Sequence, residues 1–232
     1  MRPLKAIIVS NRYGRYCVPE SSQHRPAART VVNGDVWEPE TIAFLTSHCG
    51  DGDIVHAGTY FGDFLPALSA AVAPGAGVWA FEPSAESFEC AEITMKLNDI
   101  RNVTLTNAAL GACAGTALLF TGPEGMLPRG GANTIRPARE PGGAYEDVPV
   151  VALDSVVPVH RHVSILQLDV ERYEQQALVG SLATIRRCRP ILVLEHLPAS
   201  RSWFHENVLS LGYRSIGCMN KNQAFASHEL GA

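Results

Sequence analysis

The sequence has no apolar run that approaches the roughly 18 residues needed to cross a bilayer. Near the N-terminus, "MRPLKAIIVSNRYGRY" contains only a short apolar stretch, less than the core of a signal peptide needs. Close cysteine pairs are also absent, since the six cysteines lie at positions 17, 49, 90, 113, 188 and 218. This scatter excludes a zinc knuckle and a redox CxxC motif, and it predicts buried free thiols in a reducing cytoplasm.

An excess of charge of either sign is absent as well. Charged residues make up 18% of the chain, hydrophobic residues make up 46%, and the formal net charge is −4. This balance is typical of a soluble globular protein, and it gives no electrostatic reason to expect nucleic acid or an acidic membrane surface as a partner. A length of 232 residues is sufficient for one well-packed domain with a small appendage at one end.

Two segments with different patterns make up the chain. Residues 1–35 mix basic, aromatic and turn residues, and Asn33-Gly34, between "RTVV" and "DVW", predicts a hairpin. From residue 36 the pattern changes to regular strands and helices. We therefore expect a small N-terminal strand or cover segment over 1–35 and one larger domain over 36–232.

Strand and helix patterns alternate along the larger segment. Residues 121–146 are rich in Gly, Pro and Arg and predict a long loop, of the kind that often covers a binding site. The alternation itself predicts an α/β fold with a doubly wound, mostly parallel sheet. Strands are predicted at 53–58, 77–83, 102–110, 116–120, 148–154, 163–169, 190–195 and 213–219, and helices at 38–49, 63–73, after Ser84, after residue 169 and at 200–211.

A glycine-spaced turn follows the first buried strand. In an open parallel sheet, ligands bind beyond the carboxyl ends of the strands, and Gly58 and Gly62 stand at such an end. Glu82 ends the second strand, where a carboxylate can accept hydrogen bonds from ribose hydroxyls. The first glycine of a Gly-x-Gly-x-x-Gly fingerprint is missing, which disfavours a dinucleotide. A nucleoside without phosphates, such as S-adenosylmethionine, fits better, although a plain turn beside a surface acid fits too.

Further motifs stand in order along the chain: "VWEPET" (36–41), "IVHAGTYFGDF" (54–64), "AFEPSAESFE" (80–89), "LNDIRNV" (97–103), "NAALG" (107–111), "VPVVALDSV" (148–156), "LQLDVERYEQQALVGS" (166–181) and "RPILVLEH" (189–196). In this order and at these intervals, they resemble the FkbM family of S-adenosylmethionine-dependent methyltransferases. The resemblance covers roughly residues 15–215. It implies a class I methyltransferase (Rossmann-like) fold, S-adenosylmethionine as methyl donor, and O-methylation of a sugar or other natural-product hydroxyl.

The resemblance also implies roles for individual residues. The turn from Gly58 to Gly62 would hold the methionine part of the donor, Glu82 would hold its ribose, and Asn107-Ala108 would lie against its adenine. The candidate donor-binding residues are Glu38, His56, Gly58, Thr59, Tyr60, Gly62, Glu82, Pro83, Asn107 and Ala108.

Two positions depart from the family pattern. His56 stands where the family has an acid, and a neutral imidazole offers no negative charge to the ammonium group of the donor. Asp63, Glu38 or Glu40 would have to supply that charge. Arg172 replaces the glycine that follows "DVE", and we expect it to place a large cation beside the active centre.

Methyl transfer to an alcohol requires removal of the hydroxyl proton, by a general base or a bound metal. Asp169 ends a buried strand, and Glu195 and His196 end the next, so all three are expected at the donor crevice. We expect Asp169 and His196 to be the base or orienting pair, with Glu195 as a helper. The three would also suit a divalent cation such as Mg²⁺, as distantly related sugar O-methyltransferases suggest. Glu171 and Glu174 are interpreted as acids of a first helical turn, which suit the helix dipole.

Other side chains are candidates for the acceptor side. Aromatic candidates for an acceptor pocket are Trp37, Tyr60 and Trp203, although aromatic residues more often belong to a core. Candidates for an anionic acceptor, or for solvated loop charges, are Arg129, Arg136 and Arg139.

Three functions are compatible with these features. The first is an S-adenosylmethionine-dependent O-methyltransferase with a small-molecule acceptor, such as a sugar, glycolipid or polyketide hydroxyl. The second is a catalytically silent, methyltransferase-like binding module, and the departures from the family pattern at His56 and Arg172 are compatible with it. The third is a nicotinamide-dependent oxidoreductase, which the missing glycine disfavours.

Overall fold

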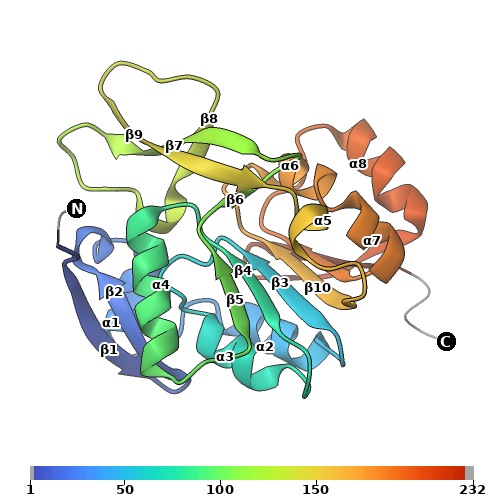
Figure 1. Cartoon of the computed structure of the whole chain (residues 1–232), viewed down its shortest axis with the longest axis horizontal. Helices are drawn as coiled ribbons and strands as arrows, with labels where there is room; N and C mark the ends of the chain where they lie inside the picture. Colours follow the sequence, from blue (N-terminus) through green and yellow to red (C-terminus); the bar gives the residue numbers. More distant parts are fainter. Residues whose placement is uncertain (1–2, 228–232) are drawn as a thin grey trace.

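A seven-stranded sheet runs through the centre of the molecule, and helices cover both of its faces (Figure 1). The computed structural model describes residues 3–227. Five neighbouring strands are parallel, and a C-terminal hairpin pairs antiparallel at one edge. In spatial order the strands are β12 (Tyr213–Met219), β13 (Asn222–Ser227), β11 (Ile191–Leu194), β10 (Val163–Leu168), β3 (Asp53–Ala57), β4 (Val78–Phe81) and β5 (Val103–Thr106). This arrangement confirms the predicted doubly wound, mostly parallel sheet.

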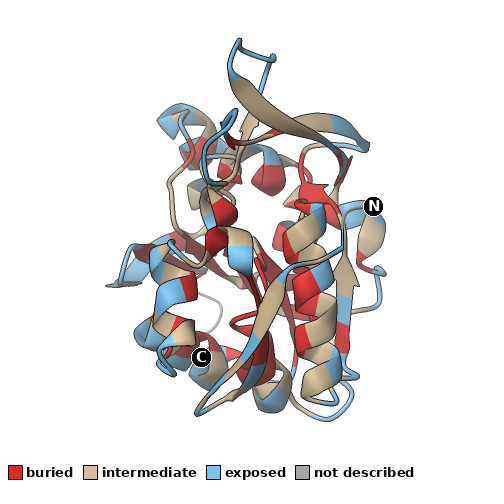
Figure 2. Cartoon of the chain, turned by 90° about the vertical axis from the view of Figure 1, so that its left-hand side faces the viewer, coloured by how far each residue is buried: buried red, intermediate tan, exposed pale blue. Residues whose placement is uncertain are grey.

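The central strands are buried on both faces, which is why they are almost wholly apolar. In β3, Ile54 faces one hydrophobic cluster and Val55 the other, and Ile165 and Leu166 of β10 divide in the same way. One face carries α2 (Pro39–His48), α3 (Leu65–Ala71) and α4 (Ala85–Leu97), and the other α5 (Leu153–Val156), α6 (Glu174–Val179), α7 (Leu182–Cys188), α8 (Arg201–Asn207) and η3 (Leu209–Leu211). Figure 2 shows the buried residues gathered between these layers.

The N-terminal segment forms a separate small layer. A hairpin of β1 (Ala6–Asn11) and β2 (Gly14–Pro19) is followed by η1 (Glu20–Ser22) and α1 (Pro26–Val32). This segment packs beside α4 through a third cluster that includes Tyr16, Val18 and Cys90. The turn predicted at Asn33-Gly34 is not a hairpin, because these residues end α1: Gly34 has φ +81° and its N–H donates to Val31 O. A left-handed glycine is a common helix end.

A second, smaller sheet lies over the carboxyl ends of the main strands. Its strands are β6 (Ala109–Leu110), β9 (Gly143–Val151), β7 (Gly115–Pro123) and β8 (Thr134–Arg136), and η2 (Gly130–Ala132) precedes β8. The loop predicted over 121–146 is therefore partly wrong. Both ends of that segment are strands, since β7 and β9 pair with each other from Gly115 to Pro123. Glycine and proline content concealed this pairing, which depends on a partner distant in sequence.

Three predicted elements near the C-terminus differ in detail. The strand expected at 148–154 ends at Val151, and α5 begins two residues later. The helix expected after residue 169 is two short helices, which Gly180 and Ser181 separate. The strand at 213–219 is confirmed as β12, but its partner β13 was not predicted.

None of the helices in residues 3–227 combines the length and the apolar character that a membrane crossing requires.

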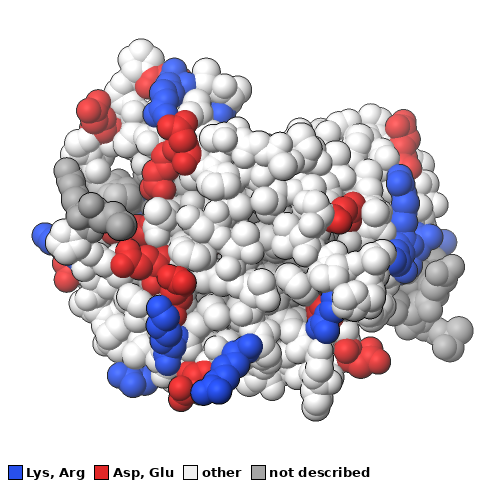
Figure 3. Space-filling view, viewed as in Figure 1, with Lys and Arg blue, Asp and Glu red and all other residues white. Residues whose placement is uncertain are grey.

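On the face drawn in Figure 3, charged side chains of both signs stand in small groups around the edge.

Candidate active site

The carboxyl ends of β4, β3, β10 and β11 are joined in one row by backbone hydrogen bonds. Gly58 N–H donates to Phe81 O at 3.0 Å, Asp169 N–H to Ala57 O at 3.0 Å, and Glu195 N–H to Leu168 O at 3.1 Å. The residues that follow these strands are therefore neighbours in space, although they are far apart in the sequence. Two adjoining pockets open at this row, and Gly58, Tyr60 and Asp169 line both.

The first pocket, here the Glu82 pocket, is lined from below by Gly58, Tyr60, Glu82, Pro83 and Ala108. The Glu82 carboxylate is held in place by two backbone amides. Oε2 accepts from Tyr60 N–H at 2.7 Å and Oε1 from Ser84 N–H at 2.9 Å. Each carboxylate oxygen has two acceptor positions, so each can accept one further hydrogen bond from a ligand. Burial raises the pKa of Glu82 to about 8.

The turn after β3 brings the backbone close to this pocket. Gly58 and Tyr60 have φ values of +86° and +53°, in the left-handed region. Glycine adopts this conformation without steric cost, whereas a tyrosine in it is strained, and strained residues cluster at functional sites. The strain at Tyr60 positions its backbone N–H on the Glu82 carboxylate.

The small sheet closes the Glu82 pocket from above. Leu119 of β7 and Ile135 of β8 line it, together with Gly130 and Gly131 of η2. Both glycines pack on the Tyr60 ring: a Cβ on Gly130 would stand 2.7 Å from Tyr60 Oη, and one on Gly131 would stand 3.2 Å from the ring. The segment 121–146 thus covers a pocket, as we predicted for it.

The second pocket, here the carboxylate pocket, is rich in acid. The basic residues that line it are Arg25 and Lys221, and the acidic ones are Glu38, Asp63, Asp169, Glu171 and Glu195. Burial raises the pKa of Asp63 to about 7, and the neighbouring Glu38 adds to the shift. Burial raises the pKa of Asp169 well above its ordinary value, and the nearby Glu195 carboxylate raises it further. Such a pocket favours a ligand that carries positive charge.

His56 lies at the inner wall of the carboxylate pocket. It is buried, it stacks on Phe64 with ring centroids 5.3 Å apart, and burial lowers its pKa to about 4. The imidazole is therefore neutral at physiological pH. Its Nδ1 contacts Gln167 Oε1 from the facing position on β10, so Nδ1 carries the proton and donates. The buried Nε2 is then an acceptor, and no group among the described residues donates to it.

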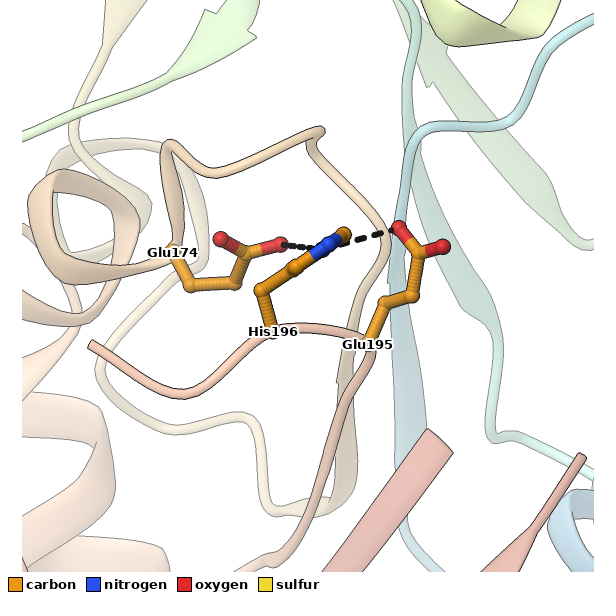
Figure 4. Close-up of side chains that lie close together, drawn as sticks. All are labelled: Glu174, Glu195 and His196. Carbon is orange, nitrogen blue, oxygen red and sulfur yellow. Dashed lines mark ion pairs between the residues drawn. The ribbon is translucent and has the colours of Figure 1, made fainter. Parts of the chain in front are cut away.

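Glu174, Glu195 and His196 form a cluster of three side chains (Figure 4). His196 Nδ1 is 3.2 Å from Glu195 Oε2 and 3.7 Å from Glu174 Oε1. Glu174 is almost completely buried at the start of α6. Figure 4 shows the two carboxylates on opposite sides of the imidazole.

The predicted site residues separate into two groups. Those that line a pocket are Glu38, His56, Gly58, Tyr60, Glu82, Pro83, Ala108, Asp169 and Glu195. Thr59, Gly62, Asn107 and His196 line neither. Asn107 instead donates from Nδ2 to Glu82 O at 2.9 Å, and Thr59 donates from Oγ1 to His56 O at 3.2 Å, so both brace the strand ends. Gly62, with φ +82°, packs against Ala91 of α4.

The other candidates also separate. Trp37 lines the carboxylate pocket with Tyr60, whereas Trp203 packs against the main core. Glu40 and Arg172 are exposed and line neither pocket, so the cation expected beside the centre points elsewhere. The three arginines of the small sheet make local contacts: Arg129 and Arg136 lie over the Phe120 ring, and Arg139 pairs with Asp147 at 2.5 Å.

Sequence reasoning missed several pocket residues. Gln167 gave a signal, since it is a polar residue inside the apolar strand "VSILQL". Glu171 was interpreted as a helix-dipole acid, but it precedes α6 and faces both pockets. Arg25 and Lys221 come from segments at opposite ends of the chain, and no local pattern indicates them.

The family model described as the methyltransferase FkbM domain matches residues 56–215, more than half of the chain. No curated protein matches the sequence. The crystal structure of methyltransferase FkbM from Methylobacillus flagellatus KT is similar over 76% of this chain and 43% of that one, with a TM-score of 0.50 and 14% identity. The structure of a tRNA (uracil-54, C5)-methyltransferase from Pyrococcus abyssi is similar over 95% of this chain and 43% of that one, with a TM-score of 0.49 and 13% identity.

The chain thus spans less than half of the length of the FkbM structure that it resembles. At these identities the structural likeness shows the fold alone, and it agrees with the predicted class I methyltransferase fold. Because the family model covers more than half of the sequence, the chain belongs to the FkbM methyltransferase family.

Proposed function

We propose that this protein transfers a methyl group from S-adenosylmethionine to a hydroxyl of a small-molecule acceptor, such as a sugar, glycolipid or polyketide. The observation that carries the proposal is the Glu82 carboxylate, which two backbone amides orient at the end of β4. It retains acceptor capacity for two ribose hydroxyls, and Ala108 supplies an apolar wall for an adenine. Family membership supports the same assignment.

The donor fits the two pockets taken together. The nucleoside would lie in the Glu82 pocket, and its methionine end would pass Gly58 into the carboxylate pocket. S-adenosylmethionine carries a sulfonium and an ammonium group there, and Glu38 and Asp63 supply the negative charge that His56 lacks. The free Nε2 of His56 can accept a hydrogen bond from the ammonium group. The histidine at position 56 is therefore compatible with donor binding.

Asp169 is the proposed general base. It lines both pockets, so it lies where donor and acceptor would meet. Burial and the nearby Glu195 raise its pKa, which makes its carboxylate a stronger proton acceptor. Bound S-adenosylmethionine supplies an activated methyl group, so the protein must align the acceptor oxygen and remove its proton. In this proposal, Asp169 takes the proton of the acceptor hydroxyl, and Glu195 orients Asp169.

Isothermal titration with S-adenosylhomocysteine tests the donor site. We expect binding to the wild type and no binding of NADH. Glu82→Ala should weaken binding roughly tenfold or more, since hydrogen bonds to charged groups contribute about 1.5–3 kcal/mol each. Glu89→Ala, a change of an exposed acid on α4, is the matched control and should leave the affinity unchanged. Binding of NADH in place of S-adenosylhomocysteine would indicate an oxidoreductase.

Methyl transfer itself needs a separate measurement. Incubation with S-adenosylmethionine labelled in the methyl group and a panel of hydroxylated glycans and polyketides should yield a labelled ether. Donor binding without transfer to any hydroxyl, amine or thiol acceptor would favour the silent module.

A further inference from the structure

Ligand atoms of three side chains converge beside the carboxylate pocket, and one of the three side chains, Glu195, also lines that pocket. Glu174, Glu195 and His196 each offer one ligand atom, and these three atoms all lie within 4.8 Å of one another. Glu174 Oε1, Glu195 Oε2 and His196 Nδ1 are buried and have no hydrogen-bond partner among the described residues, although His196 Nδ1 lies 3.2 Å from Glu195 Oε2. Glu174 is only 1% exposed. A buried carboxylate oxygen without a partner is costly, so this arrangement favours a positive charge between the two carboxylates.

The chain holds these atoms in place from two sides. Glu174 begins α6, and Glu195 and His196 directly follow β11. The amide N–H of Glu195 donates to Leu168 O, which fixes the start of the loop that carries both residues. Ser200 N–H in turn donates to Gln175 Oε1 at 3.1 Å, which ties the end of that loop to α6. The site is therefore built on braced elements.

We propose that Glu174, Glu195 and His196 bind a divalent transition-metal ion. Two carboxylate oxygens and one imidazole nitrogen suit Mn²⁺, Fe²⁺, Co²⁺ or Zn²⁺, because imidazole is a ligand of these ions. Mg²⁺ prefers oxygen ligands and keeps several waters, so it fits this buried set less well. The proposal changes the ligand set expected from the sequence, since Glu174 takes the place of Asp169.

The ion has a defined position relative to the pocket. Glu195 lines the carboxylate pocket, whereas Glu174 and His196 line neither pocket. A metal ion would therefore fix the Glu195 carboxylate, which also lies close to Asp169. His196 is then a positioning residue. This consequence for catalysis rests on the proposed function, but metal binding does not.

A proton on His196 is the alternative occupant. An imidazolium would pair with both carboxylates and satisfy them without a metal. The distances alone suit both a metal ion and a proton. A metal titration separates these alternatives, because only the metal site predicts that added metal ions bind.

The test is titration of EDTA-treated protein with CoCl₂ and MnCl₂, without methyl donor or acceptor. We expect one equivalent of Co²⁺ to give visible absorption typical of nitrogen and oxygen ligation, and Mn²⁺ to lose its free electron paramagnetic resonance signal. Glu174→Gln and His196→Ala should weaken binding at least about tenfold. His205→Ala and Glu206→Gln, exposed changes on α8, are matched controls and should bind as the wild type does.

Two results would overturn the proposal. Wild-type protein that is folded by circular dichroism but binds neither metal ion would leave the proton as occupant. Binding that Asp169→Asn abolishes and Glu174→Gln does not would place the ion at the other acidic group, Asp169, Glu171 and Glu195. Donor binding is measured separately with S-adenosylhomocysteine on the EDTA-treated protein, so failure of one proposal is distinguishable from failure of the other.

Discussion

The backbone carbonyl oxygen of Asp169 lies directly against Gly58: a Cβ added to Gly58 would stand 1.8 Å from it. The turn after β3 and the end of β10 are therefore in contact at the point where both pockets meet. Only a residue without a side chain permits this contact, and φ of +86° at Gly58 favours glycine as well.

Gly58→Ala should therefore destabilise the fold and weaken donor binding. We expect the free energy of unfolding to fall by about 2 kcal/mol or more, because the clash is with backbone and cannot be relieved by a rotamer change. Gly75→Ala is the control: Gly75 has φ +90° but no atom within 4 Å of the added Cβ. Both variants place alanine at a positive φ, but only Gly58→Ala adds the clash with Asp169 O, so the difference between their losses in urea unfolding measures the clash. Equal losses would show that the contact with Asp169 is unimportant.

Asp169→Asn should separate chemistry from donor binding. The amide keeps the size of the side chain but cannot accept a proton as a carboxylate can. Turnover should fall by roughly 10² or more, the usual scale of a general base. The affinity for S-adenosylhomocysteine should stay within a few-fold of the wild type, measured by calorimetry.

Asp147→Asn, which changes an exposed carboxylate on β9, is the control for Asp169→Asn and should leave both quantities unchanged. Loss of donor binding in Asp169→Asn with turnover per bound donor intact would place Asp169 in the donor site instead.

The stability of the ligand-free protein should fall as the pH rises from about 5 to 8. In the unfolded chain, Asp63 and Glu82 ionise near pH 4, whereas burial raises their pKa in the folded protein to about 7 and about 8. The folded state thus binds more protons between these values, and its stability is complete at low pH and lost as the pH rises. Each group contributes a slope of about 1.4 kcal/mol per pH unit.

Urea unfolding at several pH values tests this slope. Asp63→Asn and Glu82→Gln should each flatten it, whereas Glu89→Gln should not. A stability that rises between pH 5 and 8 would contradict the buried positions of both carboxyls.

Donor binding should release a proton near neutral pH. Ribose hydroxyls that donate to Glu82 favour its ionised form, which burial disfavours in the empty pocket. The affinity for S-adenosylhomocysteine should therefore increase as the pH rises toward 8, by up to about tenfold per unit. Calorimetry in buffers of different ionisation enthalpy measures the proton directly. Binding enthalpies that are independent of the buffer would mean that Glu82 is already ionised or does not contact the donor.

Arg172→Gly should stabilise the protein. Arg172 has φ +75°, in a region that costs an L-residue about 1–2 kcal/mol. This conformation explains physically why a glycine suits the position after "DVE". We expect a gain of about 1 kcal/mol in urea unfolding and unchanged donor affinity, because the side chain is exposed. Arg186→Gly is the control, because Arg186 lies exposed in the last turn of α7, and there glycine should lower the free energy of unfolding by about 1 kcal/mol.

The parallel strands of the main sheet and the order of its elements along the chain were predictable from residue 36 onward, whereas β13 was not. A strand such as "VSILQL" is buried on both faces, so its composition alone marks it, and the turns between elements carry their own signals. The small sheet was not predictable as a unit. Its strands β7 and β9 pair across residues 124–142, which are rich in glycine and proline, and pairing at that distance leaves no local pattern.

The floor of the Glu82 pocket is the part of the site that the sequence by itself determined, because Gly58 and Glu82 stand at strand ends that local patterns mark. Ala108 was indicated only by the family resemblance, and the small sheet that closes the pocket was decided by the tertiary structure. The carboxylate pocket was decided only by the tertiary structure. Its walls come from α1, the residues before α2, β3 and the turn after it, η2, β10, the residue after β11 and the C-terminal hairpin. Which side chains turn inward depends on strand register and helix orientation. For the same reason the sequence did not indicate the partner of His56: His56 contacts Gln167, which faces it across neighbouring strands and stands 111 positions away in the sequence.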